Sequence, residues 1–118
     1  ATTEIYTLSL HDALPISGEI PSAKVYEDSL VYAFRDINPQ APVHVLVIPK
    51  AHASGMADID QLDDATLAAC LRVCRTAARL EGLNSYRVIS NCGPDACQSV
   101  GHLHFHVLGG RQMTETMA

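Results

Sequence analysis

Hydrophobic and polar positions change period several times along the chain, and each change predicts an element. Residues 23–27 and 30–36 are short runs rich in Val, Tyr and Phe, and they are typical of two strands of a hairpin. Residues 43–48 are mostly apolar and stop at a proline, which predicts a central strand. Residues 86–90 and 102–108 predict two further strands.

Residues 62–80 carry the period of a helix instead. Their apolar positions follow three-and-four spacing, at Leu67, Cys70, Leu71, Cys74, Ala77, Ala78 and Leu80. Asp63 and Asp64 at the start and Arg79 near the end suit the helix dipole, and Gly82 ends the helix. Three strands, one helix and two more strands, with short connections, predict an α+β fold with an antiparallel sheet and the helix on one face.

Size and charge narrow the class of protein. The chain has 118 residues, which suits one domain, and a formal net charge of −5. Proteins that bind nucleic acid usually carry the opposite sign, so we expect no such partner. A small anionic ligand stays open, because backbone N–H groups bind phosphate without a basic surface. No apolar run approaches the ~20 residues that cross a bilayer, so we expect no membrane partner.

The four cysteines are Cys70, Cys74, Cys92 and Cys97, and none forms a C-x-x-C pair. The first two lie on the apolar face of the expected helix. We interpret the cysteines as buried thiols of a cytoplasmic protein, rather than as a disulfide framework or a zinc site.

Residues 1–16 read ATTEIYTLSLHDALPI, and they resemble a common sequencing adapter translated in one frame. We therefore expect a non-native segment at 1–16, loss of the natural N-terminus, and a single domain at 17–118.

Three histidines alternate with apolar residues at the end of the pattern. In a strand this spacing places His102, His104 and His106 on one face. Imidazole can act as nucleophile, proton carrier or metal ligand near neutral pH, so the cluster predicts either catalysis or zinc binding. His44, at the start of the 43–48 strand, could face these three, whereas His52 is expected on the surface.

The loop before the histidines, residues 91–99, is rich in turn formers and delivers Gln98 and Ser99 beside His102. The string Q-S-V-G-H-L-H-F-H-V-L-G-G-R at 98–111 resembles the signature of the histidine triad superfamily. G-E-I-P-S-A-K-V-Y-E-D at 18–28, A-F-R-D-I-N-P-Q-A-P-V-H at 33–44 and L-V-I-P-K-A-H at 46–52 resemble its Hint branch, the purine nucleotide-binding phosphoramidases.

The resemblance implies a sheet of about five antiparallel strands that continues across a homodimer, with the 62–80 helix in the interface. It implies a hydrolase that cleaves nucleoside 5′-phosphoramidates, of adenosine type, to a nucleoside monophosphate and an amine, without a cofactor or metal. His104 would be the nucleophile that forms a nucleotidyl-histidine. Its other ring nitrogen would donate to a backbone carbonyl. His102 and His106 would donate to phosphate oxygens or to the supporting network, which His44 would join.

The resemblance assigns the remaining site residues to substrate contacts. Ser99 would assist departure of the amine, and Gln98 and Asn91 would lie at the phosphate. Asp36 would bind the ribose hydroxyls of an AMP-like purine nucleotide, and Ile37 would pack on the base.

Three features depart from the family pattern. Cys97 stands where relatives usually have glycine, which is costly if the backbone needs a positive φ. Gly101 replaces a bulkier residue or proline, and the tail at 113–118 lacks the usual Trp-Pro-Pro. Two alternatives therefore stay open: a zinc enzyme built on the triad, and a non-catalytic nucleotide-binding or scaffold protein.

Overall fold

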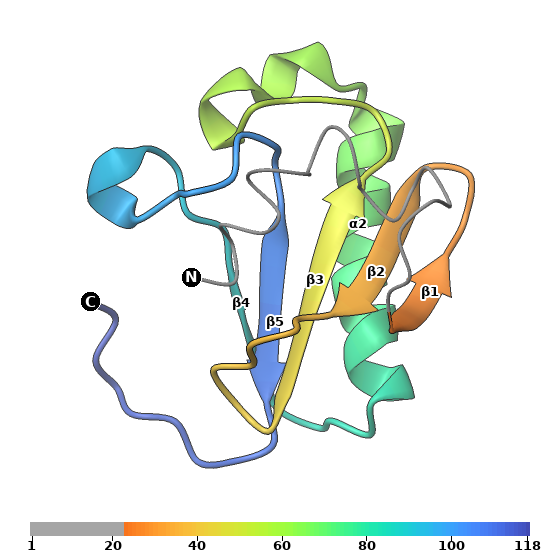
Figure 1. Cartoon of the computed structure of the whole chain (residues 1–118). Helices are drawn as coiled ribbons and strands as arrows, with labels where there is room; N and C mark the ends of the chain where they lie inside the picture. The colour runs from red at the N-terminus through yellow and green to blue at the C-terminus, as the bar shows by residue number, and fades with distance from the viewer. Residues whose placement is uncertain (1–22) are drawn as a thin grey trace.

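Five strands form one antiparallel sheet in the spatial order β1-β2-β3-β5-β4 (Figure 1). The computed structural model describes residues 23–118, so the predictions for residues 1–16 lie outside the described part. The elements are β1 (Lys24–Glu27), β2 (Val31–Arg35), β3 (Val43–Pro49), the 3₁₀ turn η2 (Met56–Gln61), α2 (Asp64–Leu80), β4 (Tyr86–Ile89), the 3₁₀ turn η3 (Pro94–Ala96) and β5 (Phe105–Gly109). The predicted α+β class is confirmed.

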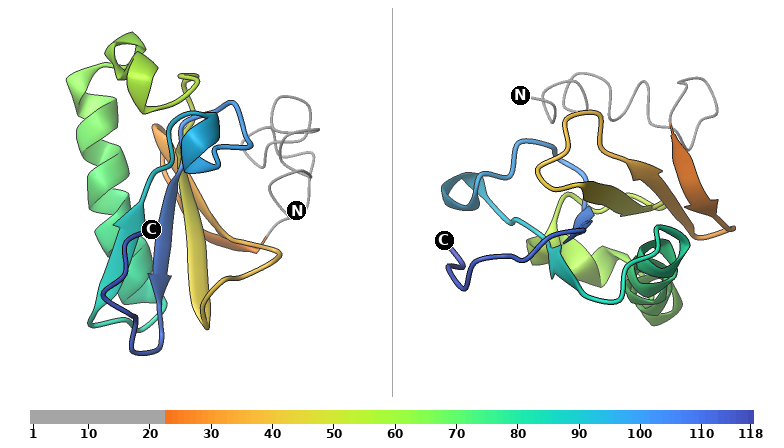
Figure 2. Two further views of the ribbon diagram at one scale, coloured as in Figure 1. Left: turned by 90° about the vertical axis from the view of Figure 1, so that its left-hand side faces the viewer. Right: turned by 90° about the horizontal axis from the view of Figure 1, so that it is seen from below.

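The helix α2 covers one face of the sheet, as Figure 2 shows edge-on. Alternation along β3 and β5 divides the side chains between the two faces. Val45, Val47, Phe105 and Val107 join the main core under α2. The opposite face carries a smaller apolar cluster of Tyr32, Phe34, Leu46, Ile48 and Val100. We call this opposite face the outer face of the sheet.

The helix begins two residues after the predicted start. Asp63 is its N-cap, and the carboxylate accepts a 2.8 Å hydrogen bond from the amide of Thr66. Gly82, at φ 77°, ends it as predicted, and the amide of Leu83 returns to the carbonyl of Ala78. Leu71 was expected on the apolar face but is exposed, because the buried stripe runs through Cys70 and Cys74 on one side of it.

The other differences lie in the connections. The last strand starts at Phe105 rather than at residue 102, so His102 and His104 precede it. The loops after β3 and after β4 contain the 3₁₀ turns η2 and η3. The sequence predicted plain connections there, because these segments are rich in polar residues and turn formers.

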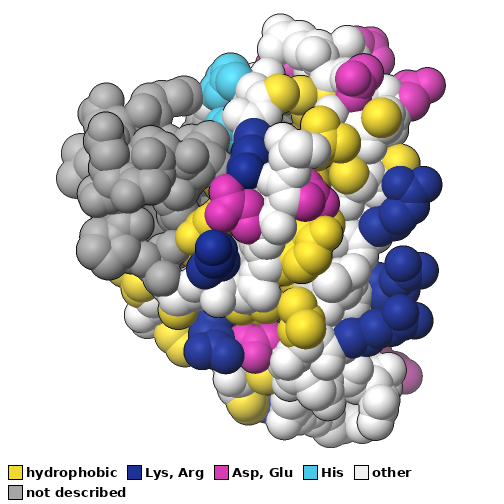
Figure 3. All heavy atoms as spheres, turned by 90° about the vertical axis from the view of Figure 1, so that its right-hand side faces the viewer, with side chains coloured by type: hydrophobic (Ala, Val, Ile, Leu, Met, Phe, Trp, Pro, Cys, Tyr) yellow, Lys and Arg dark blue, Asp and Glu magenta, His cyan; other side chains and the backbone are white. Residues whose placement is uncertain are grey.

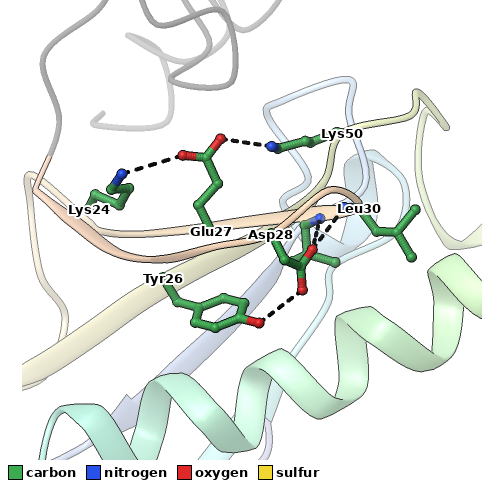
Figure 4. Close-up of polar contacts among 7 residues, drawn as sticks. Lys24, Tyr26, Glu27, Asp28, Leu30 and Lys50 are labelled. Atoms are coloured by element: carbon green, nitrogen blue, oxygen red, sulfur yellow. Dashed lines mark hydrogen bonds and ion pairs between the residues drawn. The ribbon is translucent and has the colours of Figure 1, made fainter.

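The hairpin between β1 and β2 is closed by carboxylates (Figure 4). Asp28 accepts hydrogen bonds from the amides of Leu30 and Val31 and from the hydroxyl of Tyr26. Glu27 lies between two lysines and contacts Lys50, just after β3, at 2.7 Å. These contacts join the edge of the sheet to the chain that leads away from β3.

Cys70 and Cys74 are buried as predicted, but Cys92 and Cys97 are exposed, which corrects the expectation of four buried thiols. The latter two lie on either side of η3. Among the described residues, no helix has the length and hydropathy of a membrane span.

Candidate functional site

The candidate site is built on the outer face of β3 and β5. His44 and His106 lie diagonally on these neighbouring strands, since His106 pairs with Leu46, two residues after His44. His44 Nε2 and His106 Nδ1 are 2.8 Å apart. The rings of His104 and His106 meet edge to face, with centroids 5.1 Å apart. Two of the triad histidines and His44 therefore form one cluster, whereas the sequence had predicted all three triad histidines on one face.

The hydrogen bonds decide which nitrogens of this cluster carry protons. The amide of Gln40 donates to His44 Nδ1 at 3.0 Å, so this nitrogen holds a lone pair and the proton of neutral His44 lies on Nε2. His44 Nε2 then donates to His106 Nδ1. Neutral His106 consequently carries its proton on Nε2, where it can donate to a ligand.

His104 has the opposite tautomer. Its Nδ1 lies 2.7 Å from the carbonyl oxygen of His102, and a carbonyl can only accept. The proton therefore lies on Nδ1, and the lone pair lies on Nε2. This is the contact to a backbone carbonyl that the resemblance implied for His104.

Asp36 lies beside the cluster at the end of β2. Its amide donates to the carbonyl of His44, and the carboxylate is 3.5 Å from His44 Nε2. The amide of Asn38 donates to Asp36 Oδ1. The Asp36 side chain is 3% exposed, so its charge faces the histidines with little solvent screening.

The cluster is neutral at neutral pH. Burial lowers the pKa of His104, and the hydrogen bond to the His102 carbonyl and then Asp36 oppose this only in part. Burial also lowers the pKa of His44, which Asp36 opposes in part. Burial, followed by repulsion from His104 and His44, lowers the pKa of His106 to about 4. A neutral His104 has the nucleophilic lone pair available on Nε2.

His102 turns away from this cluster. Its Nε2 lies 2.9 Å from the carbonyl oxygen of Pro49, and its Nδ1 lies 3.0 Å from His52 Nδ1. His52 is exposed, as predicted, but its contact with His102 was not predicted. Nothing local in the sequence signals this pair, because the two residues are far apart in the chain.

Gln98 joins the two loops beside the site. Its Oε1 accepts from the amide of Gly93, and its Nε2 donates to the carbonyls of Ser54 and Val100. The side chain thus fastens the η3 loop to the chain after β3. Ser99 follows it and lines a cavity of about 360 Å³ between the two loops, together with Ser54, Gly55 and Cys92.

The remaining predicted residues border the site less closely. Ile37 is 60% exposed beside Asp36. Asn91 is half-buried at the start of the η3 loop. Cys97 has φ 62° and ψ 33°, the left-handed conformation that glycine adopts without strain, so a side chain there does sit on a strained backbone.

Asp36, His44 and His106 place one ligand atom each within 4.8 Å of one another, close enough for a shared cation. The proton order opposes this use. A metal on His44 Nε2 would move the proton to Nδ1, against the N–H group of Gln40. His102, in turn, directs both ring nitrogens to Pro49 and His52. The donors therefore do not fit a metal site as they are arranged.

Comparison with known proteins places the chain in a family. The family model of the HIT domain matches residues 17–113. A "14 kDa zinc-binding protein" of Zea mays is 52% identical, over 83% of this chain and 79% of the maize protein. "Adenylylsulfatase HINT1" of Arabidopsis thaliana is 46% identical, over 83% of this chain and 69% of that protein.

A solved structure is similar as well. The HIT family hydrolase from Legionella pneumophila Philadelphia 1 has a TM-score of 0.79 and 46% identity, covering 84% of this chain and 90% of that one. With a family model over most of its length, and relatives of this similarity, the chain belongs to the HIT domain family.

Proposed function

We propose that this chain is a nucleotide-binding hydrolase that cleaves nucleoside 5′-phosphoramidates through a nucleotidyl-histidine at His104. The observation that carries the proposal is the hydrogen bond from His104 Nδ1 to the carbonyl of His102, which leaves Nε2 with a lone pair. The adjacent His106 supports it, because the Nε2–H of His106 can donate to a phosphate oxygen.

In the first step His104 Nε2 bonds to the α-phosphorus, and the phosphorus–nitrogen bond breaks. The amine leaves with a proton passed through the hydroxyl of Ser99, which regains one from solvent. In the second step a water oxygen bonds to phosphorus, the bond to Nε2 breaks, and the water proton returns to solvent. The products are the amine and the nucleoside monophosphate.

Asp36 accepts hydrogen bonds from ribose hydroxyls in this proposal, and Ile37 supports the base of an AMP-like purine nucleotide. Asn91 contacts the phosphate. Gln98 acts indirectly in this proposal, because its hydrogen bonds hold the loop that carries Ser99. No cofactor takes part.

The names of the relatives support hydrolysis at a nucleotide and suggest a second leaving group. The Arabidopsis thaliana relative is named an adenylylsulfatase, and the Legionella pneumophila structure is titled a hydrolase. Adenylylsulfate is therefore the second substrate to test. His104 would attack the same phosphorus, and sulfate would leave instead of an amine.

The relative of Zea mays is named zinc-binding, but the hydrogen bond from Gln40 to His44 argues against zinc at Asp36, His44 and His106 of this chain. We expect turnover to survive treatment with a chelator. Loss of turnover, restored by stoichiometric zinc, would support the zinc enzyme instead.

Release of AMP from adenosine 5′-phosphoramidate tests the function, with adenylylsulfate assayed in parallel. We expect wild-type turnover and a loss of at least about three orders of magnitude in His104→Ala, because the nucleophile is gone. The exposed variant Arg75→Ala serves as control. AMP binding without turnover in the wild type would leave the non-catalytic binding or scaffold protein as the function.

We also propose that the chain acts as a homodimer in a reducing cytoplasm. β4 is an edge strand of the described sheet, with Tyr86 and Val88 each about two-fifths exposed. An exposed apolar edge strand favours pairing with a second copy. Free thiols at Cys92 and Cys97 fit a reducing compartment.

A further inference from the structure

His52 and His102 form a second pair of hydrogen-bonded histidines, and the proposed reaction uses neither of their side chains. Their rings meet edge to face at 5.0 Å, with the two Nδ1 atoms 3.0 Å apart. His102 is only 1% exposed, whereas His52 lies on the surface. His102 also supplies the carbonyl that accepts from the proposed nucleophile, so the contacts of its ring need an explanation.

The direction of the hydrogen bonds in this pair follows from the carbonyl of Pro49. A carbonyl only accepts, so His102 Nε2 carries the proton of the neutral ring. His102 Nδ1 then holds a lone pair and accepts from His52 Nδ1. His52 is the donor that fixes the second end of the His102 ring.

The chain around His102 lies outside the regular hydrogen bonds of the sheet, so side-chain contacts matter more there. The strand β5 starts only at Phe105. Just before it, the amide of Leu103 donates to the carbonyl of Ala53 at 2.7 Å, and the ring of His102 reaches Pro49 and His52. Among the described residues, these contacts fasten residues 102 and 103 to the end of β3 and to the chain that follows it.

The carbonyl of His102 is also the acceptor for His104 Nδ1. The position of this carbonyl sets both the tautomer and the direction of the His104 ring. A shift of about 1 Å in a reacting group can lower a rate by about 100-fold. Movement of His102 would displace His104 Nε2 and therefore slow the reaction.

We propose that His52 is a positioning residue for His104: by donating to His102 Nδ1 it holds the carbonyl that orients the nucleophile. The inference rests on the proposed function, since it assigns His52 a part in the same reaction. His102 has a supporting role in it, and does not contact the phosphate.

The test compares His52→Ala with His52→Asn, whose amide N–H can replace the Nδ1 donor. In His52→Ala we expect kcat for phosphoramidate hydrolysis to fall about 10- to 100-fold with KM unchanged, because the nucleophile loses its orientation while the substrate contacts stay. His52→Asn should recover most of the loss. Gln61→Ala, another exposed residue of the same connection, is the matched control and should behave like the wild type.

Nitrogen NMR of the ring of His104 gives a second readout that needs no turnover. The Nδ1–H tautomer should dominate in the wild type and in His52→Asn, and should give way to a mixture in His52→Ala. If His52→Ala does not fold, His52→Leu keeps most of the side-chain volume without a donor, and the same results are expected of it.

Wild-type kcat in His52→Ala, or no recovery in His52→Asn, would overturn the inference. A wild-type protein that binds AMP but releases none would contradict the proposed function. In that case the tautomer of His104 alone decides the inference: an unchanged Nδ1–H signal in His52→Ala would overturn it.

Discussion

At the scale of single residues, two backbone groups set the chemistry of the histidine cluster. The amide of Gln40 fixes the proton of His44, and the carbonyl of His102 fixes the proton of His104. The sequence could indicate that histidines share a face, because alternation is local. It could not indicate the tautomers, because these depend on backbone groups that only the folded chain brings to the rings.

The lowered pKa values of the histidines predict how turnover depends on pH. His104 must be neutral to attack, and burial keeps its pKa below the ordinary 6.5. We expect kcat/KM to stay flat from about pH 7 downwards to below pH 6.5, and then to fall as His104 takes up a proton. A pH–rate profile whose acidic limb lies above pH 7 would contradict this ordering.

The same shifts make the fold sensitive to acid. Between about pH 4 and pH 6.5 the unfolded chain binds more protons at His106 than the folded chain does, because the folded pKa is about 4. The contribution of His106 to the free energy of unfolding should therefore be constant above pH 6.5. The free energy of unfolding should decrease as the pH falls from about 6.5 to about 4. Urea unfolding at each pH measures it. His106→Asn should show a smaller decrease, and an equal decrease would exclude His106 as the source.

Cys97 is the residue where the backbone conformation and the side chain disagree. Its left-handed conformation, which the family's glycine had suggested, carries a penalty for any side chain. We expect Cys97→Gly to raise the free energy of unfolding by about 1 kcal/mol, as measured by urea titration. Cys97→Ala is the control, because it removes the thiol and keeps the strained Cβ. Equal effects of the two variants would attribute the change to the thiol instead.

At the scale of elements, periodicity predicted what packing enforces. Alternate residues of β3 and the stripe through Cys70 and Cys74 of α2 pack into the same core. The start of β5 could not be predicted in this way. The pattern around His102 alternates as a strand does, but contacts with Pro49 and His52, distant in the chain, replace the hydrogen bonds of a strand there.

The cap of α2 offers a matched pair of variants. Asp63 accepts from the amide of Thr66, whereas Asp64 lies in the first turn. We expect Asp63→Ala to lower the free energy of unfolding by about 1 kcal/mol, since the Thr66 amide loses its partner. Asp64→Ala, with the same loss of charge, should lower it by only a few tenths of a kcal/mol. Equal losses would mean that charge near the dipole, rather than the cap, stabilises the helix.

At the scale of the whole molecule, the two sides of the sheet carry different chemistry. The cluster of His44, His104 and His106 lies on the outer face, while Figure 3 shows Lys and Arg side chains both along one edge of that view and beside acidic side chains in its middle. Arg72, Arg75 and Arg79 are exposed on α2, which covers the other face of the sheet. The proposed phosphate site therefore relies on N–H donors from imidazoles rather than on these cations.

The edge strand β4 carries the prediction of a dimer. Val88→Glu would bring a charge from each copy into the interface if two copies pair along β4. We expect sedimentation to show a dimer for the wild type and a monomer for Val88→Glu. Leu71→Glu, at an exposed position of α2, tests the helix that the resemblance also placed in the interface, and we expect it to weaken the dimer as well. A wild type that sediments as a monomer would contradict the proposal.

A covalent intermediate is the most direct test of the central proposal. The protein is mixed with adenosine 5′-phosphoramidate, quenched within the first turnover at alkaline pH, and digested for mass spectrometry. The proposal predicts one adenylyl group, attached to His104, in the peptide that contains residues 102–106. Turnover without an adduct at any time, or an adduct on another residue, would contradict it.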